Sequence, residues 1–414
     1  MTTTPMTDRA DELRAQLVDG LRTGVRRPPM NLPAPIWAAM LAVPRHAFCP
    51  PGTTLEEAYA DDVVRTRRNE TTGKTTSSVS APWLQAKMLA QAAIHRGMRV
   101  LELGSGGYNA SLIAELVGEA GYVVTVDIDQ VVVENTRAAL AAAGYAHRVT
   151  AICADATAPL DLGTFDRIIV TMGVWDIPAA WTDQLNAAGV LVAPLRARHP
   201  NECWSIDFHR DGDLLVGRTA FVCGFVDAQG VGALHPDTAD VTLADTPVTL
   251  TAWDPTTDLT HLAAELDQPT SVRVGSGVVL TPPGMFVGMR THLAFHLPGL
   301  AEITFDGGGL TRRFHQESWT TFARVDHDSL AVAGYWETDQ GHELGARGFG
   351  PRAGQVATEL AGYIAEWGER GQPQRAAHVY RVPGSTAPLE GSMLQLPGGG
   401  HLAVTQHQDR AGEV

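Results

Sequence analysis

Between Ser80 and Leu195 the hydrophobic positions alternate between the spacing of amphipathic helices and that of buried strands. The apolar runs 122–126 and 168–170 are nearly continuous, as in parallel strands that are covered on both faces. This alternation predicts a doubly wound parallel α/β sheet. Its strands are expected at 99–103, 122–127, 149–153, 165–170 and 189–194, and its helices at 82–95, 110–117, 130–143 and 178–185.

The flanking regions carry weaker patterns. Helical spacing predicts N-terminal helices at 7–21 and 36–43, followed by an irregular stretch through Gly73. Beyond Phe225 the apolar runs are short, which indicates a mixed α+β region with helices at 258–266 and 354–367 and a loose tail from Pro397. Because 414 residues exceed one typical core, we predict an N-terminal cap and substrate loop at 1–80, an α/β domain at 81–228 and a C-terminal α+β domain at 229–414.

The overall charge argues against anionic partners. The chain has 31 Lys plus Arg against 46 Asp plus Glu, a formal net charge of −15, which repels nucleic acid and anionic membranes. A local basic run formed by Arg65, Arg67, Arg68 and Lys74 is either a solvated loop or an attractor for an anionic substrate.

The cysteines and the N-terminus indicate a cytoplasmic protein. The four cysteines have no CxxC spacing and are too sparse for a disulfide scaffold. Asp8, Asp11 and Glu12 interrupt the N-terminus before any apolar run, and no stretch reaches membrane-spanning length.

A glycine-rich turn follows the first predicted strand. The segment Leu101–Tyr108 reads Leu-Glu-Leu-Gly-Ser-Gly-Gly-Tyr, so a ligand can approach the backbone where side chains would clash. The turn departs from the dinucleotide fingerprint GxGxxG at its third glycine. The Glu-Leu-Gly-Ser-Gly form is instead usual in class I methyltransferases, and it assigns Glu102, Gly104, Ser105, Gly106 and Tyr108 to a site for S-adenosylmethionine.

Acidic residues follow the next two strands. Asp127 with Ile128 ends the second strand, and Asp155 with Ala156 follows the third. At the carboxyl edge of an open sheet such acids accept hydrogen bonds from ribose hydroxyls and adenine. Either aspartate alone is equally well read as a helix cap, but together, after the glycine turn, they favour the cofactor.

Several stretches, taken in order, resemble the protein-L-isoaspartate O-methyltransferase family. They are Val43-Pro44-Arg45 with Phe48, the run 58–61, Ser78-Val79-Ser80-Ala81-Pro82, the cofactor turn, 165–170 and 185–194. The resemblance spans roughly Val43 to Pro194, and Ser-Val-Ser-Ala-Pro is its most specific element. It implies a class I Rossmann-like methyltransferase fold that binds S-adenosylmethionine.

The resemblance also implies catalytic roles for Ser80 and Ser78, because in that family the matching serine lies beside the carboxylate to be methylated. A carboxylate is already ionised at neutral pH, so its methylation needs alignment rather than a general base. Val79 is assigned to substrate binding with them. The alternative is that Ser80 only caps the helix that begins at Pro82.

Two departures from the family indicate a changed substrate. Trp83 stands where the repair enzymes have a histidine, and the 65–74 segment is more charged than usual, so Trp83, Arg65 and Arg68 are assigned to substrate binding. The C-terminal region resembles that of extended forms found with ribosomal peptides such as lanthipeptides and graspetides. By that analogy the enzyme methylates an aspartate of a cyclised precursor peptide, and the ester closes to an aspartimide.

Other functions remain open at this point. A repair methyltransferase for isoaspartate is the first alternative, and a noncatalytic peptide-recognition module is the second. His292 and His296 have the spacing of a helical metal pair, but Pro298 and the alternation around Phe295 favour a strand end, so no metal site is predicted.

Overall fold

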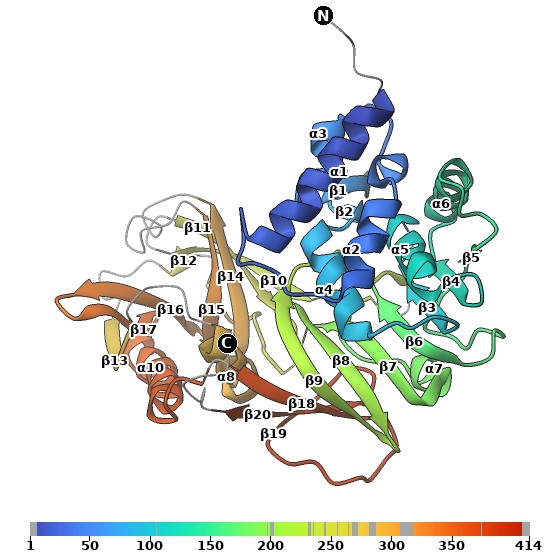
Figure 1. The fold of residues 1–414 in the computed structure, drawn as a ribbon. Helices are drawn as coiled ribbons and strands as arrows, with labels where there is room; N and C mark the ends of the chain where they lie inside the picture. The colour runs from blue at the N-terminus through green and yellow to red at the C-terminus, as the bar shows by residue number, and fades with distance from the viewer. Residues whose placement is uncertain are drawn as a thin grey trace, which may run out of the picture.

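The computed structural model of the chain describes residues 6–104, 106–196, 198, 203–230, 233–234, 236–243, 246–254, 256–263, 265–266, 272–280, 287–306, 318–373 and 375–407. Two large sheets with their helices make up most of the molecule, and the N-terminal helices lie beside the first of them (Figure 1).

The first sheet contains the predicted doubly wound strands. Its order is β19-β20-β18-β9-β8-β7-β6-β3-β4-β5, with parallel pairing from β7 to β5 and antiparallel pairing elsewhere. The parallel strands are β3 (Arg99–Leu103), β4 (Tyr122–Asp127), β5 (Val149–Cys153), β6 (Phe165–Val170) and β7 (Leu185–Leu195). The chain direction across the sheet reverses between β3 and β6, which is where open α/β sheets bind ligands.

Alternate residues of these strands fill two separate cores. Val100 and Val123 pack on one face, whereas Leu101 and Val124 pack on the other. The helices of this region are α4 (Pro82–Ala92), α5 (Tyr108–Val117), α6 (Gln130–Ala142) and α7 (Ala179–Asp183). Helix α4 stops before the predicted His95 because Ala93 adopts a left-handed conformation, with φ 45°.

The N-terminal region differs from its prediction. Helices α1 (Met6–Thr23) and α2 (Ala34–Ala42) are confirmed. The stretch expected to be irregular instead contains the 3₁₀ helix η1 (Arg45–Phe48), helix α3 (Leu55–Ala58), and a hairpin of β1 (Val64–Arg68) and β2 (Thr75–Val79). The polar run Val-Arg-Thr-Arg-Arg of β1 has no apolar alternation, so it gave no strand signal.

The second sheet is antiparallel apart from its edge strand β12 and has the order β12-β10-β11-β14-β15-β16-β17-β13. Its strands are β10 (Asp237–Leu243), β11 (Thr246–Ala252), β12 (Glu265–Leu266), β13 (Val272–Leu280), β14 (Leu300–Asp306), β15 (Ser318–Asp326), β16 (Ser329–Thr338) and β17 (Gly341–Phe349). Helix α10 (Ala353–Glu369) confirms the prediction at 354–367 and buries Leu360, Ile364 and Trp367. The helix predicted at 258–266 is wrong, since the described residues there form turns that lead into β12.

Helix α8 (Val287–His296) corrects another expectation. His292 and His296 lie on this helix rather than at a strand end, with their rings stacked 4.2 Å apart. Among the residues that the structure describes, no cluster of three or more His, Cys, Asp or Glu side chains is arranged to hold a metal ion.

The last three strands return to the first sheet beside β8 (Cys203–Asp211) and β9 (Leu214–Cys223). They are β18 (Arg375–Arg381), which pairs with β9, and the hairpin of β19 (Ser392–Gln395) and β20 (His401–His407). The expected loose tail is therefore wrong as far as His407, because this segment completes an ordered sheet. The strand order crosses the division between 81–228 and 229–414, and the three domain ranges stay a prediction.

Candidate active site

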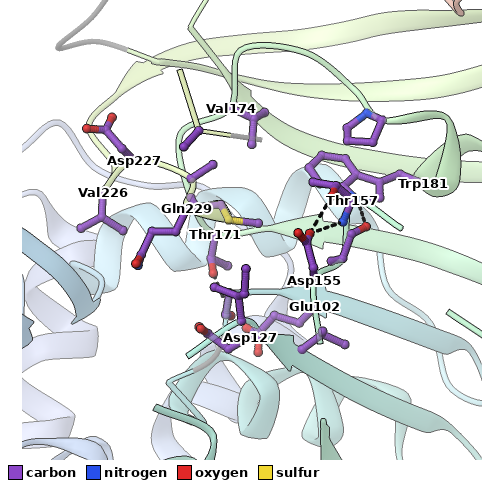
Figure 2. A pocket seen from close by; sticks show the side chains of 18 of the residues that line it. Glu102, Asp127, Asp155, Thr157, Thr171, Val174, Trp181, Val226, Asp227 and Gln229 are labelled. Carbon is purple, nitrogen blue, oxygen red and sulfur yellow. Dashed lines mark hydrogen bonds between the residues drawn. The ribbon is translucent and has the colours of Figure 1, made fainter. Parts of the chain in front are cut away.

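A cavity of about 590 Å³ opens at the carboxyl ends of β3, β4, β5 and β6 (Figure 2). Its lining brings together segments that are distant in the sequence: the hairpin strand β2, the glycine turn, the loop after β6, residues 226–229 and 233–234, and part of the C-terminal hairpin. The predicted site residues in this lining are Ser78, Val79, Ser80, Glu102, Gly104, Gly106, Tyr108, Asp127, Ile128, Asp155 and Ala156. Ser105 lies outside the described residues.

The glycine turn is shaped for close approach. Gly104 has φ +94°, and a Cβ there would lie 2.5 Å from Thr171 Oγ1. The Thr171 hydroxyl donates to the carbonyl oxygens of Gly104 (2.9 Å) or Leu103 (3.1 Å), which fixes the turn against β6. A Cβ on Gly106 would lie 3.8 Å from the carbonyl oxygen of Ser78, so turn and hairpin lie close together with little side-chain volume between them.

Glu102 lies buried under the turn, with 1% of its surface exposed. Burial raises the pKa of its carboxyl from 4.5 to about 7, against the opposing effect of its hydrogen-bond donors. These donors are Thr125 Oγ1 at 2.6 Å and Asn109 Nδ2 at 2.8 Å, from neighbouring β4 and from α5. The carboxylate therefore ties together the strand, the helix and the floor of the cavity.

The two acids lie at the ends of adjacent strands, as predicted. Asp127 Oδ1 accepts a 2.9 Å hydrogen bond from the N–H of Asp129, and it is Asp129, not Asp127, that caps α6. Asp155 Oδ1 accepts from the N–H of Thr157 at 2.9 Å and from its hydroxyl at 2.6 Å. Both carboxylates line the cavity, so the helix-cap alternative does not describe Asp127.

Aromatic and apolar side chains form the wall beside Asp155. Trp181 of α7 lies next to Asp155 and Thr157 in Figure 2, and its indole N–H donates a 2.7 Å hydrogen bond to the carbonyl oxygen of Ala156. Ile128, which directly follows β4 and is 39% exposed, also lines the cavity. Such a slot suits a flat heteroaromatic ring, with the acids at its edge.

The hairpin supplies the two serines. Ser78 and Ser80 line the cavity on β2 and just after it. The N-cap of α4 is Ala81, and this helix start has no side-chain cap hydrogen bond, so Ser80 does not cap the helix. The backbone at Ser80 is held from behind by Arg45, a fully buried side chain whose Nη1 donates a 2.8 Å hydrogen bond to the Ser80 carbonyl oxygen.

Three predicted substrate residues are outside the lining. Arg65 is exposed on β1 directly opposite Ser78, so the two side chains point to the same face of the hairpin. Arg68 is exposed and donates to the carbonyl oxygen of Gly73 at 3.1 Å. Trp83 packs under the guanidinium of Arg27, 4.5 Å from its ring centre, and beside Phe221.

Several lining residues gave no signal in the sequence. Gln229 reaches the hairpin, where its Nε2 donates to the carbonyl oxygen of Thr76 at 3.4 Å. A Cβ on Gly230 would lie 2.5 Å from Ile128 Cδ1 and 3.2 Å from Asp155 Oδ2, so Gly230 packs against Ile128 and Asp155. Trp175, Asp176, Pro383, Pro397 and Gly398 also line the cavity.

Comparison with known proteins decides the family. The model of the protein-L-isoaspartate(D-aspartate) O-methyltransferase family matches residues 22–230. The chain belongs to this family. A protein-L-isoaspartate O-methyltransferase of Methanopyrus kandleri is 35% identical over 46% of this chain and 82% of its own length. The corresponding enzyme of Hyperthermus butylicus is 35% identical over 50% of this chain and 86% of its own.

A solved protein-L-isoaspartate O-methyltransferase structure aligns over 88% of this chain and 96% of its own, with 19% identity and a TM-score of 0.49. Family membership makes this protein an S-adenosylmethionine-dependent carboxyl O-methyltransferase with a class I Rossmann-like fold, and it sets aside the noncatalytic alternative. The cavity fits the cofactor: the Gly104 turn leaves no room for a Cβ, and two carboxylates stand at adjacent strand ends. Among the described helices, none is long and apolar enough to cross a membrane.

Proposed function

We propose that this methyltransferase esterifies an aspartate side-chain carboxylate of a peptide, at a position defined by Ser80 and Ser78. The observation that supports this most directly is that both serines line the same cavity as Gly104, Asp127 and Asp155. A carboxylate near the serines would then face the methyl group of a cofactor held by the glycine turn and the acids.

S-adenosylmethionine supplies an electrophilic methyl group on a sulfonium. Asp127 and Asp155 would accept hydrogen bonds from the ribose and the adenine of the cofactor. The neighbouring Ile128 and Ala156 would contact the nucleoside. The backbone at Gly104, Ser105 and Gly106 would hold the amino-acid end of the cofactor. Glu102 and Tyr108 would support that turn from below. The target carboxylate is ionised at neutral pH, so Ser80 and Ser78 need only donate hydrogen bonds that keep one oxygen in line with the methyl carbon.

The hairpin would also read the rest of the peptide. Arg65 shares a face with Ser78 and is exposed, so we assign it to a second acidic group of the substrate. Val79 would contact the peptide inside the cavity, whereas Arg68 and Trp83 would contact only a peptide that extends beyond it. Arg67, two residues further along β1 than Arg65, is already engaged in an ion pair, because its Nε lies 2.6 Å from Asp129 Oδ2.

The finer proposal is that the target belongs to a cyclised ribosomal precursor peptide and that the ester closes to an aspartimide. In this step the backbone amide nitrogen after the aspartate attacks the ester carbonyl, loses its proton and expels methanol. Residues outside the family match, 383 and 397–398, line the cavity, which supports a narrower substrate than that of a general enzyme. The cytoplasmic location expected from the sequence stays part of this proposal.

Repair of isoaspartate is the second candidate, and the names of the relatives favour it. Mass spectrometry of two substrates separates the two roles. A tailoring enzyme should convert a cyclised precursor, through its methyl ester, to a product lighter than the starting peptide by one water, and should leave short isoaspartyl peptides unchanged. Rapid methylation of generic isoaspartyl peptides would overturn the tailoring role and leave repair.

A further inference from the structure

The carboxylate of Asp176 joins the loop after β6 to the C-terminal strands. Its Oδ1 accepts hydrogen bonds from the Tyr380 hydroxyl and from the N–H of Ile177, both at 2.8 Å. Its Oδ2 accepts from the N–H groups of Gly398 at 2.6 Å and of Gly400 at 3.4 Å. Two backbone donors, a phenol and a local amide thus converge on one carboxylate.

Gly398 and Gly400 have no room for a side chain where they approach Asp176 and Tyr380. A Cβ on Gly398 would lie 2.7 Å from Asp176 Oδ2, and a Cβ on Gly400 would lie 2.1 Å from the Tyr380 hydroxyl oxygen. The turn between β19 and β20 is closed by a 2.8 Å hydrogen bond from the N–H of Leu396 to the carbonyl oxygen of Gly400. The run Pro-Gly-Gly-Gly is therefore a tight turn that wraps its N–H groups around a carboxylate.

Tyr380 makes the contact a fixed one. Its side chain is fully buried, and its hydroxyl also lies 3.0 Å from the carbonyl oxygen of Ile177. Burial raises the pKa of the Asp176 carboxyl, whereas the hydrogen bonds from Tyr380, Ile177, Gly398 and Gly400 act in the opposite direction. The loop that follows β6 is thereby attached to strands that lie outside residues 22–230.

This contact places an outer wall on the cavity, formed by Pro383, Pro397 and Gly398. Pro397 and Gly398 are exposed, so they lie at the mouth. The wall comes from the β18–β20 side of the sheet, whereas Asp127 and Asp155 follow β4 and β5 at the opposite side. Because Pro397 and Gly398 are exposed, we assign the wall to what enters the mouth, and the cofactor Kd in the variants distinguishes this role from contact with the nucleoside.

The chemistry of the outer wall is apolar. Two proline rings carry no N–H donor, and the N–H of Gly398 is already bound to Asp176. The charged side chain beside the wall, Asp176, has both carboxylate oxygens engaged by hydrogen-bond donors. A charged substrate residue placed against it would lose water without gaining a partner, whereas an apolar residue would lose nothing.

We propose that the outer wall is a specificity determinant that selects peptides with apolar residues beside the target acid, and that Asp176 is the positioning residue that holds it. This rests on the proposed carboxyl methylation of a peptide and adds the substrate class of the same site. Asp176 acts through the wall and has no role in the methyl transfer itself.

The test compares two synthetic peptides with the same central target, flanked on both sides by Leu or by Lys. Each is made as a macrocyclic peptide with an aspartyl target and as a linear peptide with an isoaspartyl target, so that the tailoring target and the repair target are both covered. The full-length protein should prefer the Leu-flanked peptide by about tenfold or more in kcat/KM. In D176N and G398A this preference should fall toward one through a higher KM for the Leu-flanked peptide, with the Kd for S-adenosylhomocysteine changed by less than about twofold.

Control variants test whether the change in preference is specific to the outer wall. Asp213 also holds this region, accepting a 3.2 Å hydrogen bond from Ser385, but lies outside the cavity, so D213N should keep the preference. G362A, in open space on α10, should keep it as well. Tyr380→Phe removes only a hydroxyl and should reproduce the loss in milder form should D176N fold poorly. Arg65 is unchanged in every variant, so its own effect on Lys-flanked peptides cancels.

Three results would overturn the proposal. An unchanged preference in D176N, G398A and Tyr380→Phe would show that the wall selects nothing. A weaker cofactor Kd with an unchanged peptide KM would assign the wall to the nucleoside. Absence of a methyl ester on every peptide with the unmodified protein would instead overturn the proposed function, and this inference with it.

Discussion

The guanidinium of Arg45 is buried behind the active-site hairpin and donates a 2.8 Å hydrogen bond to the carbonyl oxygen of Ser80. The same side chain donates through Nε to the carbonyl oxygen of Ala58 at 2.7 Å and through Nη2 to the backbone carbonyl oxygen of Asp62 at 2.9 Å. One guanidinium therefore holds three backbone segments. Burial lowers the pKa of Arg45, and its guanidinium carbon lies over the ring of Tyr108, 5.3 Å from the ring centre. The backbone at Ser80, the serine proposed to align the substrate, is thus held by a residue from a different part of the chain.

Replacing Arg45 by Lys should lower both the stability of the protein and the rate of methyl transfer. A single ammonium cannot reach three carbonyl oxygens in different directions, so buried acceptors lose their donors. We expect a loss of about 3 kcal/mol in the free energy of unfolding, measured by urea titration, and a fall in kcat with little change in cofactor Kd. The exposed Arg22→Lys is the control. A variant with full kcat would show that Ser80 holds its position without Arg45.

The parallel strands could be predicted because burial on both faces leaves apolar runs. β3, β4, β5 and β6 begin and end at their predicted residues. The acids Asp127 and Asp155 could be placed because Asp127 ends β4 and Asp155 comes two residues after β5, which puts both at the ligand edge. The hairpin strand β1 could not be predicted, because its residues are all exposed or half-buried and show no alternation of apolar and polar positions.

The contact between Asp176 and Tyr380 shows why other parts of the site were missed. It depends on the pairing of β18 with β9, a long-range register that no local pattern encodes. The glycine run 398–400 was visible, but glycine serves both a flexible tail and a tight turn. Only the carboxylate that its N–H groups reach distinguishes the two. The same limit applies to Gly230, which packs close to Ile128 and Asp155 although it is distant from both in the sequence.

Gly230→Ala should weaken cofactor binding. Gly230 has φ +75°, where an alanine is strained, and its Cβ would lie 2.5 Å from Ile128 Cδ1. The backbone at Gly230 must then move away from Ile128 and Asp155. We expect the Kd for S-adenosylhomocysteine, measured by calorimetry, to rise about tenfold. Gly224→Ala, which meets no atom within 4 Å, serves as the control. Equal affinities for both variants would remove this segment from the cofactor site.

Glu102 should make stability depend on pH. Its folded-state pKa is raised from 4.5 to about 7, so between these values the folded protein keeps a proton that the unfolded chain has released. The stabilising contribution is therefore fully present below about pH 4.5 and is lost as pH rises through about 7. The full difference is about 3 kcal/mol, on an order-of-magnitude basis.

Denaturant titrations of Glu102→Gln at pH 5 and pH 8 measure this term. The unmodified protein should lose stability relative to the variant as the pH rises, because the glutamine amide carries no proton to release. The exposed Glu119→Gln reports the pH dependence of the remaining groups. Parallel pH curves for Glu102→Gln and the unmodified protein would show that Glu102 ionises as it does in water.

Ser80→Ala distinguishes an aligning hydroxyl from a helix cap. A cap would stabilise α4 by about 1 kcal/mol, but the N-cap is Ala81 and makes no side-chain hydrogen bond. We therefore expect an unchanged free energy of unfolding. The kcat for methyl ester formation should fall about tenfold to a hundredfold, because a carboxylate without its donor spends less time in line with the methyl carbon. Ser385→Ala, at a serine outside the cavity, should leave kcat unchanged. The opposite pattern, a less stable variant with full kcat, would make Ser80 a structural residue and leave Ser78 as the only hydroxyl of the pair for alignment.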